Sequence, residues 1–251
     1  MDEDLEDKVW FPPLITPFRL RERQDALTEA IKGASGAGDD YRGAGSLFYV
    51  GRFELIEFAV VLEPAEPLMI ARKIFYAGMN AVADALSVLS PPEKPITFHY
   101  PGSLYFDGAL VGGGRLATPA ECGEDGTPEW LVFGAMVRAG GMRFSDKGAA
   151  PEITTLDDEG FDAWNPPAFA ASFARNFLVG IDSWGERGMR MIGPDYLSRL
   201  EKREGETRRG IDENGDLIIH EKDRERARRV SLTEGLKRAE WFDPLLNEPR
   251  G

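Results

Sequence analysis

Two glycine clusters combine residue types suited to holding an anion: 42-RGAGS-46 and 112-GGGR-115. Glycine permits close backbone approach and positive φ, so successive N–H groups can form an anion cradle. The arginine at the edge of each cluster could neutralise a phosphate or carboxylate. The alternative interpretation is that both clusters serve turns or tight strand packing. The predicted binding residues are Arg42, Gly43, Gly45, Ser46, Gly112, Gly113, Gly114 and Arg115.

Neither cluster fits the dinucleotide-binding pattern or the P-loop pattern. There is no GxGxxG between a strand and a helix, and no GxxxxGK[ST]. His99 lies in a predicted apolar strand and could act as a general base. It has no Asp or Glu nearby in the sequence, so a structural histidine is the favoured interpretation. With two histidines and one cysteine, we predict no metal site built from soft ligands.

The single cysteine is a second candidate for covalent chemistry. Cys122 lies in the polar loop 117-ATPAECGEDG-126, beside three acidic residues. A nucleophilic cysteine needs a base or a positive site to stabilise its thiolate, and acidic neighbours raise the thiol pKa instead. The residue types around Cys122 therefore argue against a catalytic role. One cysteine also allows no internal disulfide, which fits a reducing compartment.

Apolar periodicity predicts the elements that must position these residues. Spacings of three and four indicate a long helix from Pro67 to Leu89, ended by two prolines. A second helix carries an aromatic stripe of Phe169, Phe173 and Phe177, which favours core packing over a ligand site. Shorter helices are expected over 21–33 and 194–200. Strands are expected over 47–52, 58–62, 96–100, 103–107 and 130–138.

The tail of the chain changes character. Strand-like runs at 209–221 and 228–235, with a turn sequence at 212-DENG-215, predict a small β unit. We therefore expect an acidic disordered tail over 1–8, a mixed α+β domain over 9–200 and a small C-terminal β domain over 201–251.

Charge and hydropathy argue against two classes of protein, general nucleic-acid binders and membrane-spanning proteins. The formal net charge of −13 excludes a general nucleic-acid binder, because phosphate contacts need a basic face. Basic residues do cluster at 202–209 and 222–229, either as a solvated mixed-charge surface or as a docking edge for an acidic partner. We predict no membrane span, because no apolar run is long enough. The start is acidic rather than signal-like, so we expect a cytoplasmic protein.

The order of these features resembles the biotin/lipoate protein ligase superfamily over about residues 40–240. The stretch 42–46 stands where that family has its adenylate loop, and 58–62 with the helix from Leu68 follow in order. The stretch 99-HYPGS-103 stands at the family's KWPND motif, and 107-DGALVG-112 matches its hairpin. The runs 131-LVFGA-135, 154-TTL-156 and 209-RGIDENGDL-217 match the later strand and the biotin-ligase tail. The resemblance is greatest to bacterial biotin/lipoate-ligase-like proteins of unknown function.

The resemblance implies a fold and an activity. The fold would be a class II synthetase/biotin-ligase-like mixed β-sheet with helices, plus a small SH3-like C-terminal domain. Ligases of this family use ATP with Mg²⁺ to convert biotin or lipoate to an acyl-adenylate, and then pass the acyl group to a lysine of a biotinyl or lipoyl carrier domain. The three glycines would line the acyl-adenylate pocket.

The departures from the family pattern leave more than one hypothesis. His99 stands at the catalytic lysine position, and Gly102-Ser103 replace the Asn-Asp pair. A neutral imidazole carries no fixed charge. The chain is therefore either an ATP-dependent ligase with Arg42 and Arg115 as phosphate clamps, or a non-catalytic binding protein for a small carboxylate or acyl-adenylate. A cysteine-dependent octanoyltransferase using Cys122 is a third hypothesis.

Overall fold

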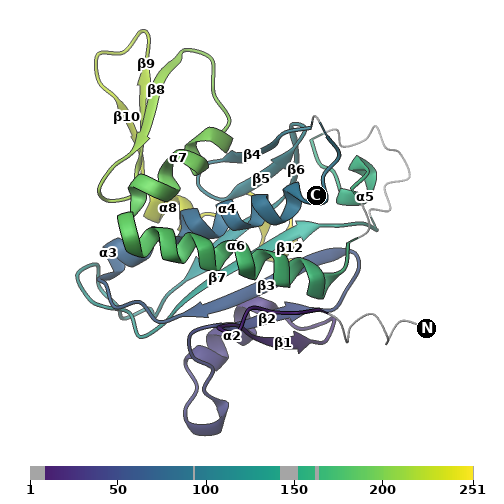
Figure 1. Cartoon of the computed structure of the whole chain (residues 1–251). Helices are drawn as coiled ribbons and strands as arrows, with labels where there is room; N and C mark the ends of the chain where they lie inside the picture. The colour runs from purple at the N-terminus through teal and green to yellow at the C-terminus, as the bar shows by residue number, and fades with distance from the viewer. Residues whose placement is uncertain (1–8, 93, 142–151, 162–163, 251) are drawn as a thin grey trace.

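The structure is a computed structural model that describes residues 9–92, 94–141, 152–161 and 164–250. The tail predicted over 1–8 lies outside the described residues. The described residues form a seven-stranded sheet of order β1-β2-β3-β7-β6-β5-β4, in which only β1 and β2 run parallel (Figure 1). The strands are β1 (Thr16–Leu20), β2 (Ser46–Val50), β3 (Leu55–Leu62), β4 (Ile96–His99), β5 (Ser103–Phe106), β6 (Ala109–Ala117) and β7 (Leu131–Arg138).

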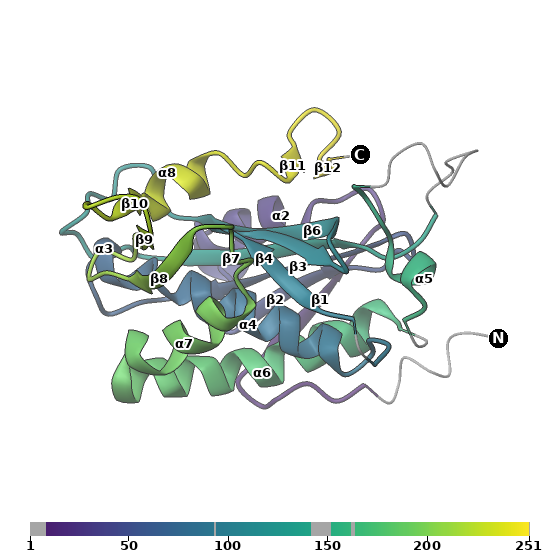
Figure 2. The same cartoon turned by 90° about the horizontal axis from the view of Figure 1, so that it is seen from above.

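The helices divide between the two faces of this sheet. Figure 2 shows α4, α6 and α7 on one side, which we call the helical face, and α8, β11 and β12 on the other. No helix within the described ranges is long and apolar enough to cross a membrane. The helices are α2 (Ala26–Ala34), α3 (Leu68–Ala71), α4 (Ile74–Ser87), α5 (Leu156–Glu159), α6 (Pro166–Arg187), α7 (Met189–Arg199) and α8 (Leu232–Lys237), with a 3-10 turn at Gly38–Asp40.

The long helix expected from Pro67 to Leu89 is present but divided. A tight turn at Arg72 and Lys73 separates α3 from α4, and the Lys73 N–H bonds the carbonyl of Ile70 at 3.1 Å. The expected apolar stripe of α4 is fully buried in the main core. The periodicity therefore predicted the buried side correctly, but it did not show the turn.

The aromatic stripe of α6 is core, as expected. The Phe173 ring stacks on Phe133 of β7 at 5.8 Å, and Phe177 lies 5.9 Å from the same ring. The helix begins at Asn165, whose side chain accepts the N–H of Ala168, and two prolines follow at its first positions. It ends at Gly188, which has positive φ.

The C-terminal β unit shares the core of the main sheet. Leu217, Ile219 and Leu232 belong to the same buried cluster as Phe98 and Tyr196. Its SH3-like identity and the boundary at residue 200 remain predictions. The sequence analysis did not predict α8 or the last two strands. The C-terminal strands are β8 (Glu206–Ile211), β9 (Leu217–Glu221), β10 (Arg228–Val230), β11 (Phe242–Asp243) and β12 (Glu248–Pro249).

Two helical glycines provide a matched test of this packing. A Cβ on Gly78 of α4 would overlap the Phe133 ring, whereas one on Gly185 of α6 would meet open space. We expect Gly78→Ala to destabilise the fold by about 1–3 kcal/mol through overpacking. Gly185→Ala should stabilise it by about 0.5–1 kcal/mol, because alanine lowers the entropy cost of an exposed helix position. Urea denaturation measures both, and equal changes would contradict the packing described here.

Candidate functional site

A row of paired residues crosses the sheet and joins several predicted site positions. His99 lies opposite Ser103, Ser103 opposite Gly113, Gly113 opposite Met136, and Met136 opposite Glu57. Directly paired residues point to the same face of a sheet. This face is opposite α4, because Met136 lies outside the main helical core. We call it the glycine face.

The three glycines of β6 have different neighbours. A Cβ on Gly114 would press on the sulfur of Met79 in α4, and one on Gly112 would overlap the carbonyl of Met136. These two glycines therefore serve tight packing, which was the alternative interpretation. A Cβ on Gly113 would overlap the indole of Trp241. Of the three, Gly113 is the one whose missing side chain leaves room on the glycine face for the Trp241 indole.

The group over Gly113 belongs to the end of the chain. Residues 239–250, which we call the C-terminal hairpin, contain β11 and β12 and lie on the glycine face (Figure 2). Trp241 is 2% exposed, and its Nε1 has no hydrogen-bond partner among the described residues. The Phe242 ring lies 4.0 Å from the guanidinium carbon of Arg115. A cavity of about 230 Å³ remains beside Trp241, between α8 and the turn at 101–102.

The first turn of α2 borders the same face with two carboxylates. Asp25 caps the helix and accepts the N–H of Thr28 at 2.6 Å. Glu57 of β3 accepts the N–H of Ala26 at 2.7 Å and is only 3% exposed. The positive end of the helix dipole therefore faces both carboxylates.

Three arginines complete a charged cluster between the sheet and the C-terminal hairpin. Arg115 lies 3.4 Å from Asp25, and Arg52 lies 3.5 Å from Glu57. Arg52 also reaches Glu248 of the hairpin at 3.6 Å. Arg138 donates to the carbonyl oxygen of Pro249, and Asn247 donates to Asp25 at 3.0 Å. The buried Nε atoms of Arg52 and Arg115 have no hydrogen-bond partner among the described residues.

The two carboxylates of this cluster respond differently to burial. Burial raises the pKa of Glu57 to about 7, against the bonded N–H of Ala26 and the charges of Arg52 and Arg115. Burial would also raise the pKa of Asp25, but hydrogen bonds from Thr28 and Asn247 and the charge of Arg115 lower it overall. Asp25 is therefore an anion near neutral pH, whereas Glu57 changes charge there.

The loop of the first glycine cluster holds a carboxylate of the chain itself. Glu63 accepts the N–H of Ala44 at 3.0 Å and the hydroxyl of Tyr41. Gly45 adopts φ +85°, and a Cβ at this position would overlap the carbonyl oxygen of Leu14, so both the backbone conformation and the close approach require glycine. Ser46 is buried at the start of β2, and a Cβ on Gly43 would overlap Glu63. The loop also borders an apolar cavity of about 510 Å³ on the helical face.

Arg42 and Arg115 are not brought together. Arg42 donates to the carbonyls of Asp39 and Tyr41 at 2.6 and 2.8 Å, beside the end of α2 at Gly33. Arg115 lies at the start of α2 beside Asp25. The 9 residues of α2 span about 13 Å. The structure therefore places the two predicted clamp residues at opposite ends of a helix.

His99 lies on the outermost strand of the sheet, at one end of the row. Its ring stacks on Tyr105 at 3.8 Å, and its Nε2 contacts the carboxylate of Glu201. The acidic partner of His99 is therefore Glu201, which is distant in the sequence and could not be found by inspecting the neighbours of His99. The side chain is 36% exposed and stands two strands away from β6.

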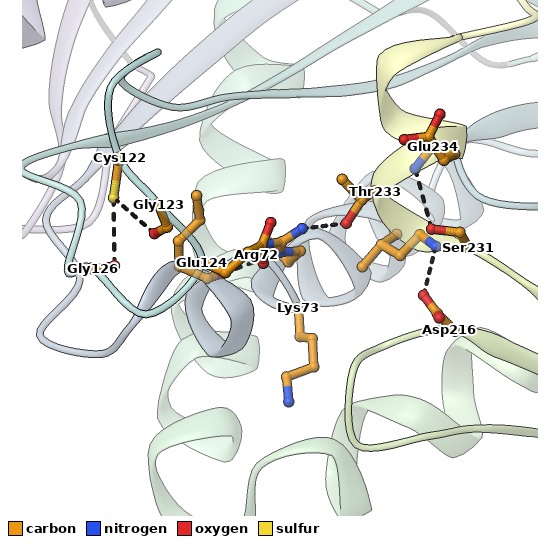
Figure 3. Close-up of polar contacts among 12 residues, drawn as sticks. Arg72, Lys73, Cys122, Gly123, Glu124, Gly126, Asp216, Ser231, Thr233 and Glu234 are labelled. Atoms are coloured by element: carbon orange, nitrogen blue, oxygen red, sulfur yellow. Dashed lines mark hydrogen bonds and ion pairs between the residues drawn. The ribbon is translucent and has the colours of Figure 1, made fainter.

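Cys122 lies apart from the glycine face. Its sulfur contacts the carbonyls of Gly123 and Gly126 at 3.5 and 3.4 Å (Figure 3). Figure 3 shows Lys73 directed away from Cys122, and its Nζ donates to the carbonyl of Glu213 at 2.6 Å. Both of these contacts are with backbone carbonyl oxygens rather than with a base or a cation.

The sequence analysis missed most of the charged cluster. A glutamate inside the buried run 55-LIEFAVVL-62 was a visible signal for Glu57, since isolated buried charges are rare. Asp25, Arg52 and Arg138 gave no such signal, because charged residues at element ends are common. Trp241 could be found only from its contact with Gly113.

The raised pKa of Glu57 predicts a pH effect on stability. The native pKa of about 7 exceeds the ordinary value of 4.5. Stabilisation from this group is therefore fully present below pH 4.5 and is lost as the pH rises through 7, by about 3 kcal/mol at most. Glu57→Gln should remove this loss between pH 5 and 8 in urea denaturation, while the exposed Glu54→Gln should retain it. An unchanged loss in Glu57→Gln would contradict the burial argument.

The comparisons with known proteins give the family and the fold of the chain. Residues 11–198 match the biotin/lipoate A/B protein ligase family. Among curated proteins, none matches significantly. A solved structure of a biotin protein ligase-like protein of unknown function from Silicibacter sp. tm1040 has 26% identity and a TM-score of 0.75, covering 91% of this chain and 99% of that one.

Two more distant structures share the fold. The biotin protein ligase from Aquifex aeolicus in complex with biotin and ATP has 12% identity and a TM-score of 0.59, covering 86% of this chain and 95% of that one. The biotin protein ligase from Leishmania major in complex with biotinyl-5-AMP has 13% identity and a TM-score of 0.52, covering 88% and 99%. The match over most of the chain and the mixed sheet together show that the chain belongs to the biotin/lipoate A/B protein ligase family.

Proposed function

We propose that this protein binds a small carboxylate, free or as an acyl-adenylate, on the glycine face, and that it does not form the adenylate itself. The observation that carries the proposal is the guanidinium of Arg115 beside Gly113. The Arg115 Nε is buried without a hydrogen-bond partner among the described residues. An unsatisfied buried donor costs about 1–3 kcal/mol, so an anionic ligand atom there would be favourable.

The absence of a lysine supports binding without adenylation. Lysine at the position of His99 would supply a fixed charge for the charge that develops during acyl transfer. The His99 ring instead stacks on Tyr105 and contacts Glu201 at the sheet edge. The His99 side chain therefore supplies no fixed positive charge to a ligand bound beside Arg115.

ATP would need the same face. Arg52, Arg115 and Arg138 are the cations available for its phosphates, and guanidinium groups suit phosphate geometry. When bound, ATP would supply the adenylyl group that activates a carboxylate. Mg²⁺ bound with ATP takes one or two protein carboxylates besides the phosphate oxygens. Asp25 and Glu57 are the carboxylates that this face would offer to it.

A second candidate is an ATP-dependent ligase that passes an acyl group to a carrier-protein lysine. The solved relatives with biotin and ATP, or with biotinyl-5-AMP, favour it. ATP–pyrophosphate exchange with octanoate, biotin and lipoate separates the candidates. We expect no exchange above background in the wild-type protein. Exchange that depends on one of these acids would instead support the ligase.

Arg115 and Arg42 provide a matched pair for locating the ligand. Octanoyl-sulfamoyl-adenosine, a stable acyl-adenylate analogue, is the probe for isothermal titration calorimetry. Arg115→Gln should raise its Kd about 10- to 100-fold, because a charged hydrogen bond contributes about 1.5–3 kcal/mol. Arg42→Gln should change Kd less than about threefold, because its guanidinium bonds its own loop.

Two outcomes would change this assignment. Equal weakening by both variants would mean that the ligand spans both ends of α2. An unchanged Kd in Arg115→Gln, with its melting temperature retained, would place the ligand elsewhere.

A further inference from the structure

We propose that the C-terminal hairpin is an internal competitor for the ligand: Phe242 covers Arg115, where the ligand's anionic group would bind, and the Glu248 carboxylate occupies the neighbouring Arg52. This inference rests on the proposed binding at the glycine face. It adds the regulation of that site: the ligand binds after the hairpin has moved away.

Two of the hairpin's polar contacts are those expected of a bound anionic ligand, because they present oxygen acceptors to arginines. Glu248 presents a carboxylate to Arg52 at 3.6 Å, and Pro249 presents a carbonyl oxygen to Arg138. Asn247 donates to Asp25 at 3.0 Å. Each contact joins a hairpin group to a charged side chain of the sheet or of α2. The hairpin therefore satisfies groups that would otherwise face solvent or a ligand.

The apolar contacts cover the rest of the site. Trp241 fills the space that Gly113 leaves, and Phe242 covers the guanidinium of Arg115. The cavity left beside Trp241 has about 230 Å³. Pockets for small-molecule ligands commonly have about 300–1,000 Å³. An acyl-adenylate would therefore overlap the space that Trp241 and Phe242 occupy.

The charge of the site favours exchange of the hairpin for an anion. Without Glu248, the face has three arginines, at positions 52, 115 and 138, against the carboxylates of Asp25 and Glu57. Three cations against two carboxylates leave a charge of +1 when Glu57 is ionised and +2 when it is protonated, in a protein of net charge −13. An incoming anion restores the balance that Glu248 provides in the closed form.

The hairpin is built to be released as a unit. Its strands are two residues each and, among the described residues, pair with one another and with no strand of the main sheet. Leu245 and Leu246 at its tip are 93% and 69% exposed. Trp241 is thus its principal apolar anchor on the sheet. Opening the hairpin therefore costs mainly the burial of the Trp241 indole, and ligand binding on the same face must offset that cost.

The test compares hairpin variants by calorimetry with octanoyl-sulfamoyl-adenosine. Glu248→Gln should lower the Kd by about two- to fivefold, because it weakens the partly exposed pair with Arg52. Trp241→Ala should lower it by about tenfold or more. Glu225→Gln, with the same charge change in the exposed turn between β9 and β10, should leave the Kd unchanged. Melting temperatures establish that each variant is folded at the assay temperature.

The outcomes separate this inference from the proposed function. Equal Kd values in the wild-type protein and both hairpin variants would overturn the competition, while binding at the face would stand. Weaker binding in Trp241→Ala would also overturn it, because the indole would then be a ligand contact. Binding in neither the wild-type protein nor Trp241→Ala would overturn both proposals.

Discussion

The contact between Trp241 and Gly113 organises the glycine face. A strand position without a side chain lets the indole lie directly on the sheet, and the indole covers the central row from β5 to β7. Truncating a buried aromatic side chain costs about 3–5 kcal/mol. The partly exposed pair of Arg52 and Glu248 contributes about 0–1 kcal/mol. The apolar contact therefore holds the hairpin in place, while the ion pair orients the Glu248 side chain toward Arg52.

The electrostatics of the face follow from the start of α2. The positive end of the helix attracts Asp25 and Glu57, and these carboxylates in turn partner Arg115 and Arg52. Burial then raises the pKa of Glu57 to about 7, so the charge of the face depends on pH near neutrality. The same arginines that bond the hairpin are those that suit a carboxylate or phosphate. One set of residues thus serves both the closed form and the proposed ligand.

Local patterns in the sequence predicted the helices and strands whose apolar residues recur at regular spacings. The stripe of α6 and the buried run of β3 follow from apolar spacing, whereas β6 was not among the strands expected from the sequence. The contact of Trp241 with Gly113 could not be predicted, because it joins segments distant in the chain and has no period. Arg42 and Arg115 looked equivalent in sequence. Their separation depends on how α2 crosses the sheet, which only the tertiary structure shows.

Hydrogen–deuterium exchange of the peptide containing Trp241 tests the central claim most directly. The exchange of residues 239–250 would be followed with and without saturating octanoyl-sulfamoyl-adenosine. Displacement of the hairpin predicts faster exchange over 241–249 in the complex, together with slower exchange in β6 and at the start of α2. Slower or unchanged exchange of the hairpin in the ligand-bound protein would contradict the claim that ligand and hairpin compete for one face.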